Sequence, residues 1–190
     1  MNKKTIRMLI GIPTGIALLI SLIFFENIKG YFRFQWYCSN EGGLKVYEKL
    51  EKNVGWISKD KHDARVIAQQ HHIGFSLYKD KEGNLVNVIY KNGNPSSFKS
   101  YDFVQYDGGN DPRYEYKRSH ERLNRNEEIR LYKGSYVVVD RKSGNPAIQF
   151  SKFAYSFFDK NNVLLASPGG RSGCHKYHEF FEGINSNFKD

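Results

Sequence analysis

The chain lacks the sequence patterns that mark the common hydrolases and nucleotide-binding proteins. Neither Gly-x-Ser-x-Gly nor His-Glu-x-x-His occurs, and no pair of carboxylates is arranged for acid–base chemistry. A phosphate loop with a Lys-Ser/Thr ending is missing as well. Internal repeats, low-complexity tracts and heptad series are absent, which excludes solenoid and coiled-coil architectures. No catalytic residue and no cofactor is therefore predicted.

Charged residues are absent between Met8 and Phe25, directly after a start that carries Lys3, Lys4 and Arg7. As a helix this run would span about 27 Å, close to the ~30 Å hydrocarbon core of a bilayer. No small-residue cleavage site follows Phe25. A retained transmembrane anchor over residues 8–25 is therefore favoured over a cleaved signal peptide.

Flanking charge predicts how this anchor is oriented. Residues 1–7 are basic and contain no acid, which places them in the cytoplasm. The aromatics within residues 26–37 suit a juxtamembrane helix at the membrane interface. Residues 38–190 then form one exported domain, so the expected localisation is a bacterial inner membrane with the domain in the periplasm.

Cysteine is scarce, and the two cysteines, Cys38 and Cys174, are expected to pair in an oxidising compartment. Two unpaired thiols are the alternative. The only Asn-x-Ser/Thr sequence contains proline at Pro95, which disallows glycosylation. Its absence elsewhere fits a bacterial periplasm better than a eukaryotic lumen.

The net charge is +9, and residues 1–25 contribute three basic residues and no acid to it. The exported part therefore carries 26 basic against 20 acidic residues. Outside a membrane this balance predicts an anionic surface or another envelope protein as partner, and no nucleic acid. The basic residues near Lys117 and Arg118 alternate with acids, which is typical of a solvated face.

Turn signals and alternating apolar residues predict an α+β domain with one curved antiparallel sheet, a meander, and two or three short helices. Helices are expected at residues 44–52, 60–72 and 175–181. A hairpin is expected around Glu82-Gly83-Asn84. Further strands are expected at residues 75–78, 85–90, 101–106, 114–123, 129–140, 148–158 and 163–166.

One short segment resembles a motif of uncharacterised bacterial single-pass membrane-anchored proteins. It reads Cys38-x-x-Glu41-Gly42-Gly43-x-x-Val46-Tyr47-Glu48 and lies just after the expected anchor. The resemblance implies the same compartment and topology. It implies no activity.

Four histidines, His71, His72, His175 and His178, are the weak candidates for a metal site, although no metal is predicted. Histidine and cysteine together can hold zinc, but Cys174 is expected in the disulfide. The favoured function is a binding or structural component of the cell envelope without catalysis. A periplasmic hydrolase or metal-dependent enzyme that uses these histidines is the alternative.

Overall fold

The computed structural model describes residues 14–15, 22, 24–123, 131–156 and 171–189 of the chain. The described elements, in chain order, are α2 (Phe25–Asn40), β1 (Gly43–Val46), β2 (Val54–Ser58), α3 (Lys61–Ala68), β3 (Ile73–Lys79), β4 (Leu85–Tyr90), the 3-10 turn η1 (Phe98–Ser100), β5 (Tyr101–Gln105), β6 (Tyr114–Arg122), β7 (Leu131–Asp140), β8 (Pro146–Ser156), β9 (Arg171–Cys174) and α4 (Tyr177–Ser186). The strand predicted at residues 163–166 lies outside the described residues.

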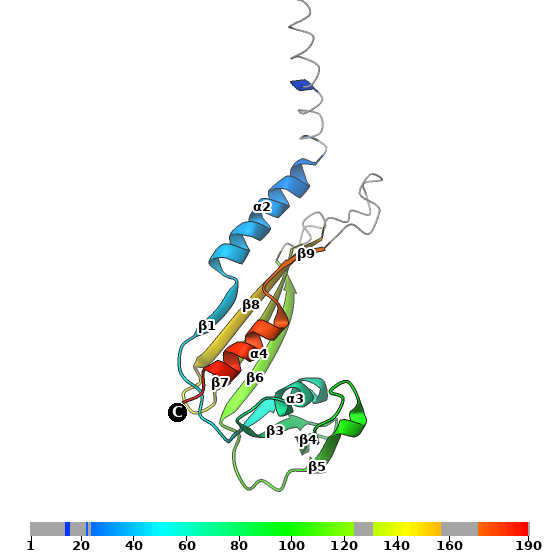
Figure 1. Ribbon diagram of the computed structural model, residues 1–190, viewed down its shortest axis with the longest axis vertical. Coiled ribbons are helices and arrows are strands. Elements are labelled where there is room, and N and C mark those ends of the chain that lie inside the picture. The colour runs from blue at the N-terminus through cyan, green and yellow to red at the C-terminus, as the bar shows by residue number, and fades with distance from the viewer. Residues whose placement is uncertain (1–13, 16–21, 23, 124–130, 157–170, 190) are drawn as a thin grey trace, which may run out of the picture.

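The strands form one sheet in the order β1-β8-β7-β6-β2-β3-β4-β5, with β9 paired to β8 (Figure 1). β2 is parallel to both of its neighbours, β3 and β6. The pair β2–β3 is parallel because α3 carries the chain back across the sheet before β3 begins. The domain is α+β as predicted, but the sheet is mixed, and the predicted antiparallel meander is wrong.

Local turn chemistry explains the elements that were predicted well. Gly83 has a φ of 89°, which a glycine adopts without strain, and it joins the antiparallel strands β3 and β4. Asp60 caps α3 by accepting a hydrogen bond at 2.9 Å from the backbone N–H of Asp63. The hairpin and the helix expected within residues 60–72 are therefore both present.

The helix predicted at residues 44–52 is wrong. Gly43 has a φ of 87°, and the chain from Gly43 to Val46 pairs with β8 as strand β1. Leu44 then reaches the core, where its side chain lies against Gly183. The apolar spacing that suggested a helix is satisfied here by a strand and an irregular turn, since the backbone finds its partners in β8.

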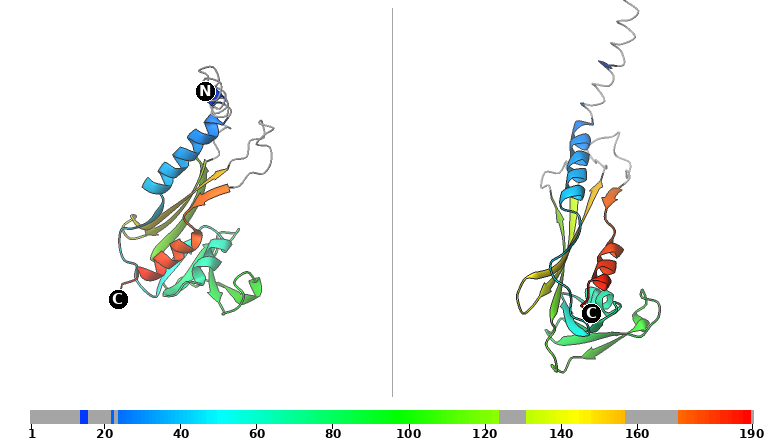
Figure 2. Two further views of the ribbon diagram at one scale, coloured as in Figure 1. Left: turned by 45° about the horizontal axis from the view of Figure 1, so that its top comes forward. Right: turned by 60° about the vertical axis from the view of Figure 1, so that its left-hand side comes forward.

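Helices α2 and α4 lie on opposite faces of the long strands (Figure 2). Successive residues of β8 point to opposite faces, as in any strand. Phe150 contributes to the cluster with Phe180 of α4, whereas Phe153 and Tyr155 contribute to the cluster with Phe34 of α2. One strand therefore anchors a helix on each side.

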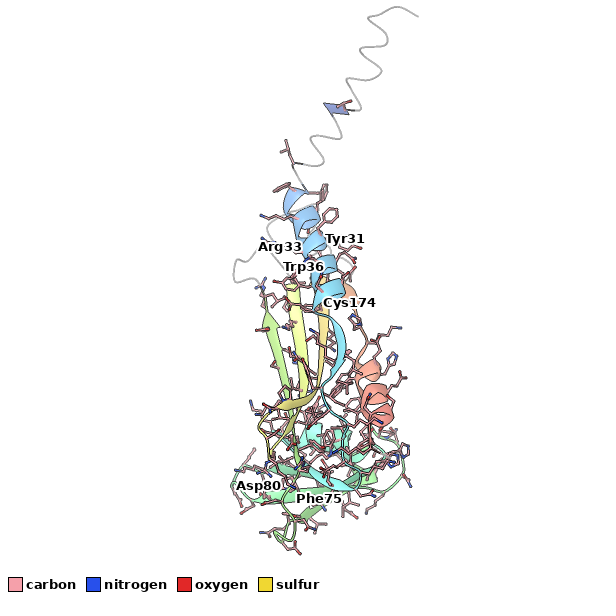
Figure 3. All side chains as sticks on the ribbon, turned by 90° about the vertical axis from the view of Figure 1, so that its left-hand side faces the viewer. Tyr31, Arg33, Trp36, Phe75, Asp80 and Cys174 are labelled. Atoms are coloured by element: carbon pink, nitrogen blue, oxygen red, sulfur yellow. A yellow bond between two sulfur atoms is a disulfide. The ribbon has the colours of Figure 1, made fainter. Side chains whose placement is uncertain are left out.

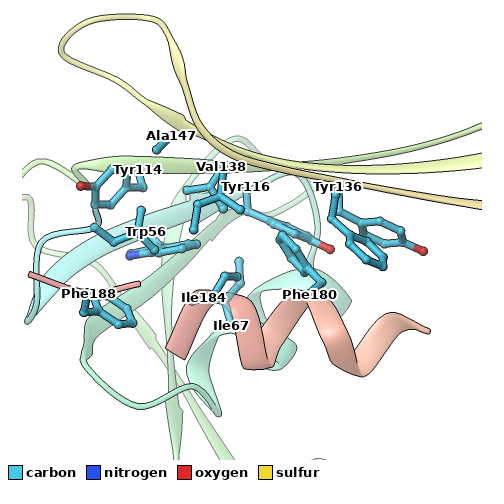
Figure 4. Packing of buried hydrophobic residues seen from close by; sticks show 13 residues of the cluster. Trp56, Ile67, Tyr114, Tyr116, Tyr136, Val138, Ala147, Phe180, Ile184 and Phe188 are labelled. Carbon is cyan, nitrogen blue, oxygen red and sulfur yellow. The ribbon is translucent and has the colours of Figure 1, made fainter. Parts of the chain in front are cut away.

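The main core lies between the sheet, α3 and α4 (Figure 4). Phe180 is fully buried, and its ring centroid lies 5.9, 5.7 and 5.8 Å from those of Tyr116, Tyr136 and Phe150. Trp56 of β2 is also fully buried. Each such side chain contributes about 1.5–3 kcal/mol by its burial.

A disulfide joins Cys38 at the end of α2 to Cys174 of β9, as expected from the cysteine count. Figure 3 shows Cys174 beside α2, while Phe75 and Asp80 lie at the other end of the molecule. Tyr37 stacks on Phe153 with the ring centroids 5.3 Å apart. The covalent bond and the packing together hold α2 against β8.

The predicted membrane anchor, residues 8–25, lies almost entirely outside the described residues. Within the described part, no helix is both long and apolar enough to cross a membrane. The predicted transmembrane anchor, and the inner-membrane localisation that rested on it, are therefore not supported by the structure. The helix at this end, α2, has 16 residues and spans about 24 Å, and it buries Phe34 against the sheet. It covers residues 26–37, for which a juxtamembrane helix was predicted, and it packs on the folded domain.

Candidate functional site

Two of the predicted site residues, His71 and His72, lie in the turn between α3 and β3. Their ring centroids are 6.5 Å apart, and both side chains are exposed. The ring of His72 packs edge-on against Phe188 at 5.4 Å. Because Phe188 follows α4, this pair lies near the C-terminal end of that helix.

The other two, His175 and His178, lie at the N-terminal end of α4. Nδ1 of His175 is 3.3 Å from a carboxylate oxygen of Glu179, and Nε2 is 3.4 Å from the carbonyl oxygen of Cys38. α4 has ten residues, so its ends are about 15 Å apart. The structure does not bring the four histidines together, and in the described part of the chain no three His, Cys, Asp or Glu side chains are grouped to hold a metal ion.

A basic groove lies on the sheet face opposite α3, between β2, β3, β6, β7 and the loop before β6. Its volume is about 940 Å³. The basic and acidic residues that line it are Lys59, Lys79, Lys117, Arg118 and Arg141 with Asp111 and Glu115. We call this cavity and its lining residues the basic groove.

Strand direction explains why three separate segments meet in the basic groove. Lys59 directly follows β2, and Lys79 ends β3. Since the two strands are parallel, their carboxyl ends lie at the same edge of the sheet. β6 is parallel to β2 as well, so Lys117 lies beyond the same edge. Ligands of open sheets with parallel strands often bind outside these carboxyl ends.

The floor of the basic groove is apolar. Ile57, Leu85 and Val137 line it together with Pro112. In β6 the odd-numbered residues point to this face, whereas Tyr116 points to the core. The groove therefore presents ammonium and guanidinium groups around an apolar base, which suits a ligand with both carboxylates and apolar side chains.

Two of the basic side chains, Lys117 and Arg118, are already paired with acidic residues. Nζ of Lys117 lies 3.1 Å from a carboxylate oxygen of Glu115. Lys59, Lys79 and Arg141 have no acidic partner within ion-pair distance among the residues that the structure describes. Arg141 donates from Nη1 to the carbonyl oxygen of Pro112 at 2.7 Å, which holds its guanidinium at the rim. Three positive charges thus remain available for an anionic partner.

Arg118 links the basic groove to α3. Its Nη1 lies 3.2 Å from Asp63, which is buried, and Nη2 lies 3.7 Å from Asp60. Burial raises the pKa of Asp63, while the charge of Arg118 opposes that shift. Burial also raises the pKa of Tyr116, and the neighbouring Tyr177 adds to it. Asp63 and Tyr116 are both buried in the core. The carboxylates of Asp60 and Asp63 hold the guanidinium of Arg118 in place.

The residues of the basic groove carry no sequence signal as a group. Lys117 and Arg118 belong to a pattern that indicated a solvated face, and Lys59, Lys79 and Arg141 are isolated in sequence. The segments that carry them are joined by the parallel pairing of β2, which the sequence did not predict. Arg125 and Arg130 of the same pattern lie outside the described residues.

The resemblance of residues 38–48 to bacterial membrane-anchored proteins stays a prediction. In the structure Gly42 fills a tight turn, since a Cβ there would lie 2.6 Å from the carbonyl oxygen of Cys38 and 2.7 Å from the ring of His175. The two glycines thus have a structural role beside the disulfide. No protein-family model, curated protein or solved structure matches this chain.

Proposed function

We propose that this chain is a non-catalytic binding domain whose basic groove holds an acidic segment of a partner protein. The observation that carries the proposal is the set of three positive side chains, Lys59, Lys79 and Arg141, around an apolar floor. An acidic segment supplies carboxylates for the rim and apolar side chains for the floor. The disulfide Cys38–Cys174 supports action in an oxidising compartment.

The expected complex is weak and sensitive to salt. Exposed ion pairs contribute about 0.2–1 kcal/mol each, so three of them supply no more than about 3 kcal/mol. The apolar floor must add the rest through buried area. Raising the ionic strength from about 0.01 M to 0.15 M shortens the Debye length from about 30 Å to about 8 Å and should weaken binding.

Fluorescence anisotropy with a labelled octapeptide of alternating glutamate and valine tests this proposal. The groove variant Lys59→Glu/Lys79→Glu should bind the peptide at least about tenfold more weakly than the wild type, equivalent to about 1.4 kcal/mol. The control variant Lys45→Glu/Lys49→Glu has the same net charge, but both of its sites are exposed and lie outside the groove. It should bind within about twofold of the wild type.

Equal losses in the groove and control variants would mean that net charge alone attracts the peptide, and the proposal would fail. Equal binding of a peptide of alternating lysine and valine would also contradict it, because the groove would then not select for negative charge.

A further inference from the structure

Strand β6 extends beyond its pairing with β2, its neighbour on one side. β2 pairs with β6 only from Tyr114 to Tyr116, whereas β7 pairs with β6 from Tyr114 to Arg122. From Lys117 to Glu121, no strand in the described part of the sheet occupies the β2 side of β6. The chain leaves this position at the end of β2, where it turns into α3.

Two hydrogen bonds fix the direction of the backbone groups along this open edge. The N–H of Leu123 donates to the carbonyl of Leu131 at 2.9 Å, and the N–H of Arg141 donates to the carbonyl of Arg113 at 3.0 Å. The pairing between β6 and β7 has no register shift. Because bonded pairs alternate along an antiparallel ladder, the odd-numbered residues of β6 face β7. The backbone N–H and C=O groups of Arg118 and His120 therefore point to the open edge.

A cavity lies beside this edge on each face of the sheet. Lys117 and Ser119 line the basic groove on one face. His120 lines a second cavity of about 680 Å³ on the other face, together with Lys152 of β8. Side chains of a strand added to this edge would alternate between the two cavities.

The charges of the edge favour an acidic occupant over a second copy of this chain. Lys117 is paired with Glu115, and Arg118 is paired with Asp60 and Asp63. The remaining positive charges beside the edge belong to Lys59 and Lys79 in the basic groove and to Lys152 in the second cavity, and Glu121 is the acid among the edge residues. Positive charge on an exposed edge repels the same edge of another copy. The same charge attracts carboxylates.

We propose that the open edge of β6, from Lys117 to Glu121, binds the acidic segment of the partner protein as an additional β-strand. This inference rests on the proposed function and specifies how the segment is held. The backbone groups of Arg118 and His120 would form the ladder, and the two cavities would receive alternate side chains.

The variant His120→Pro tests the ladder, because proline removes an N–H that faces the open edge and leaves the bonds to β7 in place. His120→Ala is the matched control, since it removes the imidazole and keeps the N–H. With the glutamate–valine octapeptide, His120→Pro should bind at least about tenfold more weakly than His120→Ala. Circular dichroism of both variants checks that the sheet is intact.

A change in the peptide gives the same test without any change in the protein. N-methylation of every second residue removes the donors along one edge of the peptide and keeps its charge. Two such peptides, methylated in the two possible alternations, should differ, and one of them should lose at least about tenfold in affinity. This measurement decides the question even if His120→Pro does not fold.

The outcomes separate the two proposals. If the octapeptide binds and needs Lys59 and Lys79, but His120→Pro and both methylated peptides bind as well as their controls, the added strand is wrong and the proposed function stands. If the octapeptide binds the wild type no better than it binds Lys59→Glu/Lys79→Glu, the proposed function itself is wrong.

Discussion

Removal of the disulfide is expected to destabilise the fold and to loosen α2 from β8. Cys38 and Cys174 are 136 positions apart. In the chain-entropy relation, a loop of that length is worth about 5 kcal/mol at 25 °C, and native bridges in small domains contribute about 2–5 kcal/mol. Replacing both cysteines by alanine should lower the free energy of unfolding by that amount. The midpoint of thermal unfolding should then fall by about 5–20 °C.

Chemical unfolding followed by circular dichroism measures this change. The double variant Cys38→Ala/Cys174→Ala avoids a single reactive thiol. The reduced wild type should unfold like the double variant, and reductant should leave the variant unchanged. Hydrogen exchange adds a local measurement, because the amides of α2 should exchange faster than those of α4 once the covalent link at the end of α2 is gone.

Two results would refute this reasoning. An unfolding free energy within about 1 kcal/mol of the wild-type value would mean that the bridge constrains the unfolded chain far less than the loop length implies. Unchanged exchange in α2 would mean that the packing of Phe34 and Tyr37 holds this helix without the bridge.

Three further predictions concern packing and charge. Phe180→Ala removes a fully buried ring and should lower the free energy of unfolding by about 3–5 kcal/mol in urea denaturation. Gly30→Ala should destabilise by about 1–2 kcal/mol, because a Cβ there would lie 2.6 Å from the hydroxyl of Tyr155. Arg118→Met leaves the buried carboxylate of Asp63 with less compensation and should cost about 3 kcal/mol at pH 7. Burial raises the pKa of Asp63 above its unfolded value of 3.8, so this cost should shrink as the pH falls through the folded-state pKa and vanish below about pH 3.8.

Each of these has a distinct contrary result. A loss below about 1 kcal/mol for Phe180→Ala would place this ring outside the core. A gain for Gly30→Ala, as helix propensity alone would give, would mean that α2 does not approach Tyr155 closely. A cost for Arg118→Met that is equal at pH 3 and pH 7 would mean that the ionised form of Asp63 is not its source.

Elements with strong local signals were predicted correctly. The turn at Gly83 needs a positive φ, and the strands on either side are rich in β-branched and aromatic residues, so β3 and β4 follow from local chemistry. The C-terminal helix was expected at residues 175–181 and occupies Tyr177–Ser186. Its apolar face is visible in the sequence because Tyr177 and Phe181 are one turn apart.

Elements whose partners are distant in sequence were predicted poorly. Residues 44–52 have helical spacing, but Leu44 is placed by pairing with Phe150 of β8, more than a hundred positions away. Strand β2 is short and contains Gly55, so its local signal is weak. Its pairing with both β3 and β6 is what makes the sheet mixed.

The amino-acid sequence was enough to predict the α+β class, the hairpin at Gly83, the helix near the C-terminus and the pairing of Cys38 with Cys174. These properties depend on local backbone preferences or on residue counts. The assembled fold was needed to show the mixed sheet, the packing of α2 on β8, the separation of the histidines and the basic groove. They depend on which strands become neighbours, and this is set by burying the whole apolar surface at once, which no local pattern encodes.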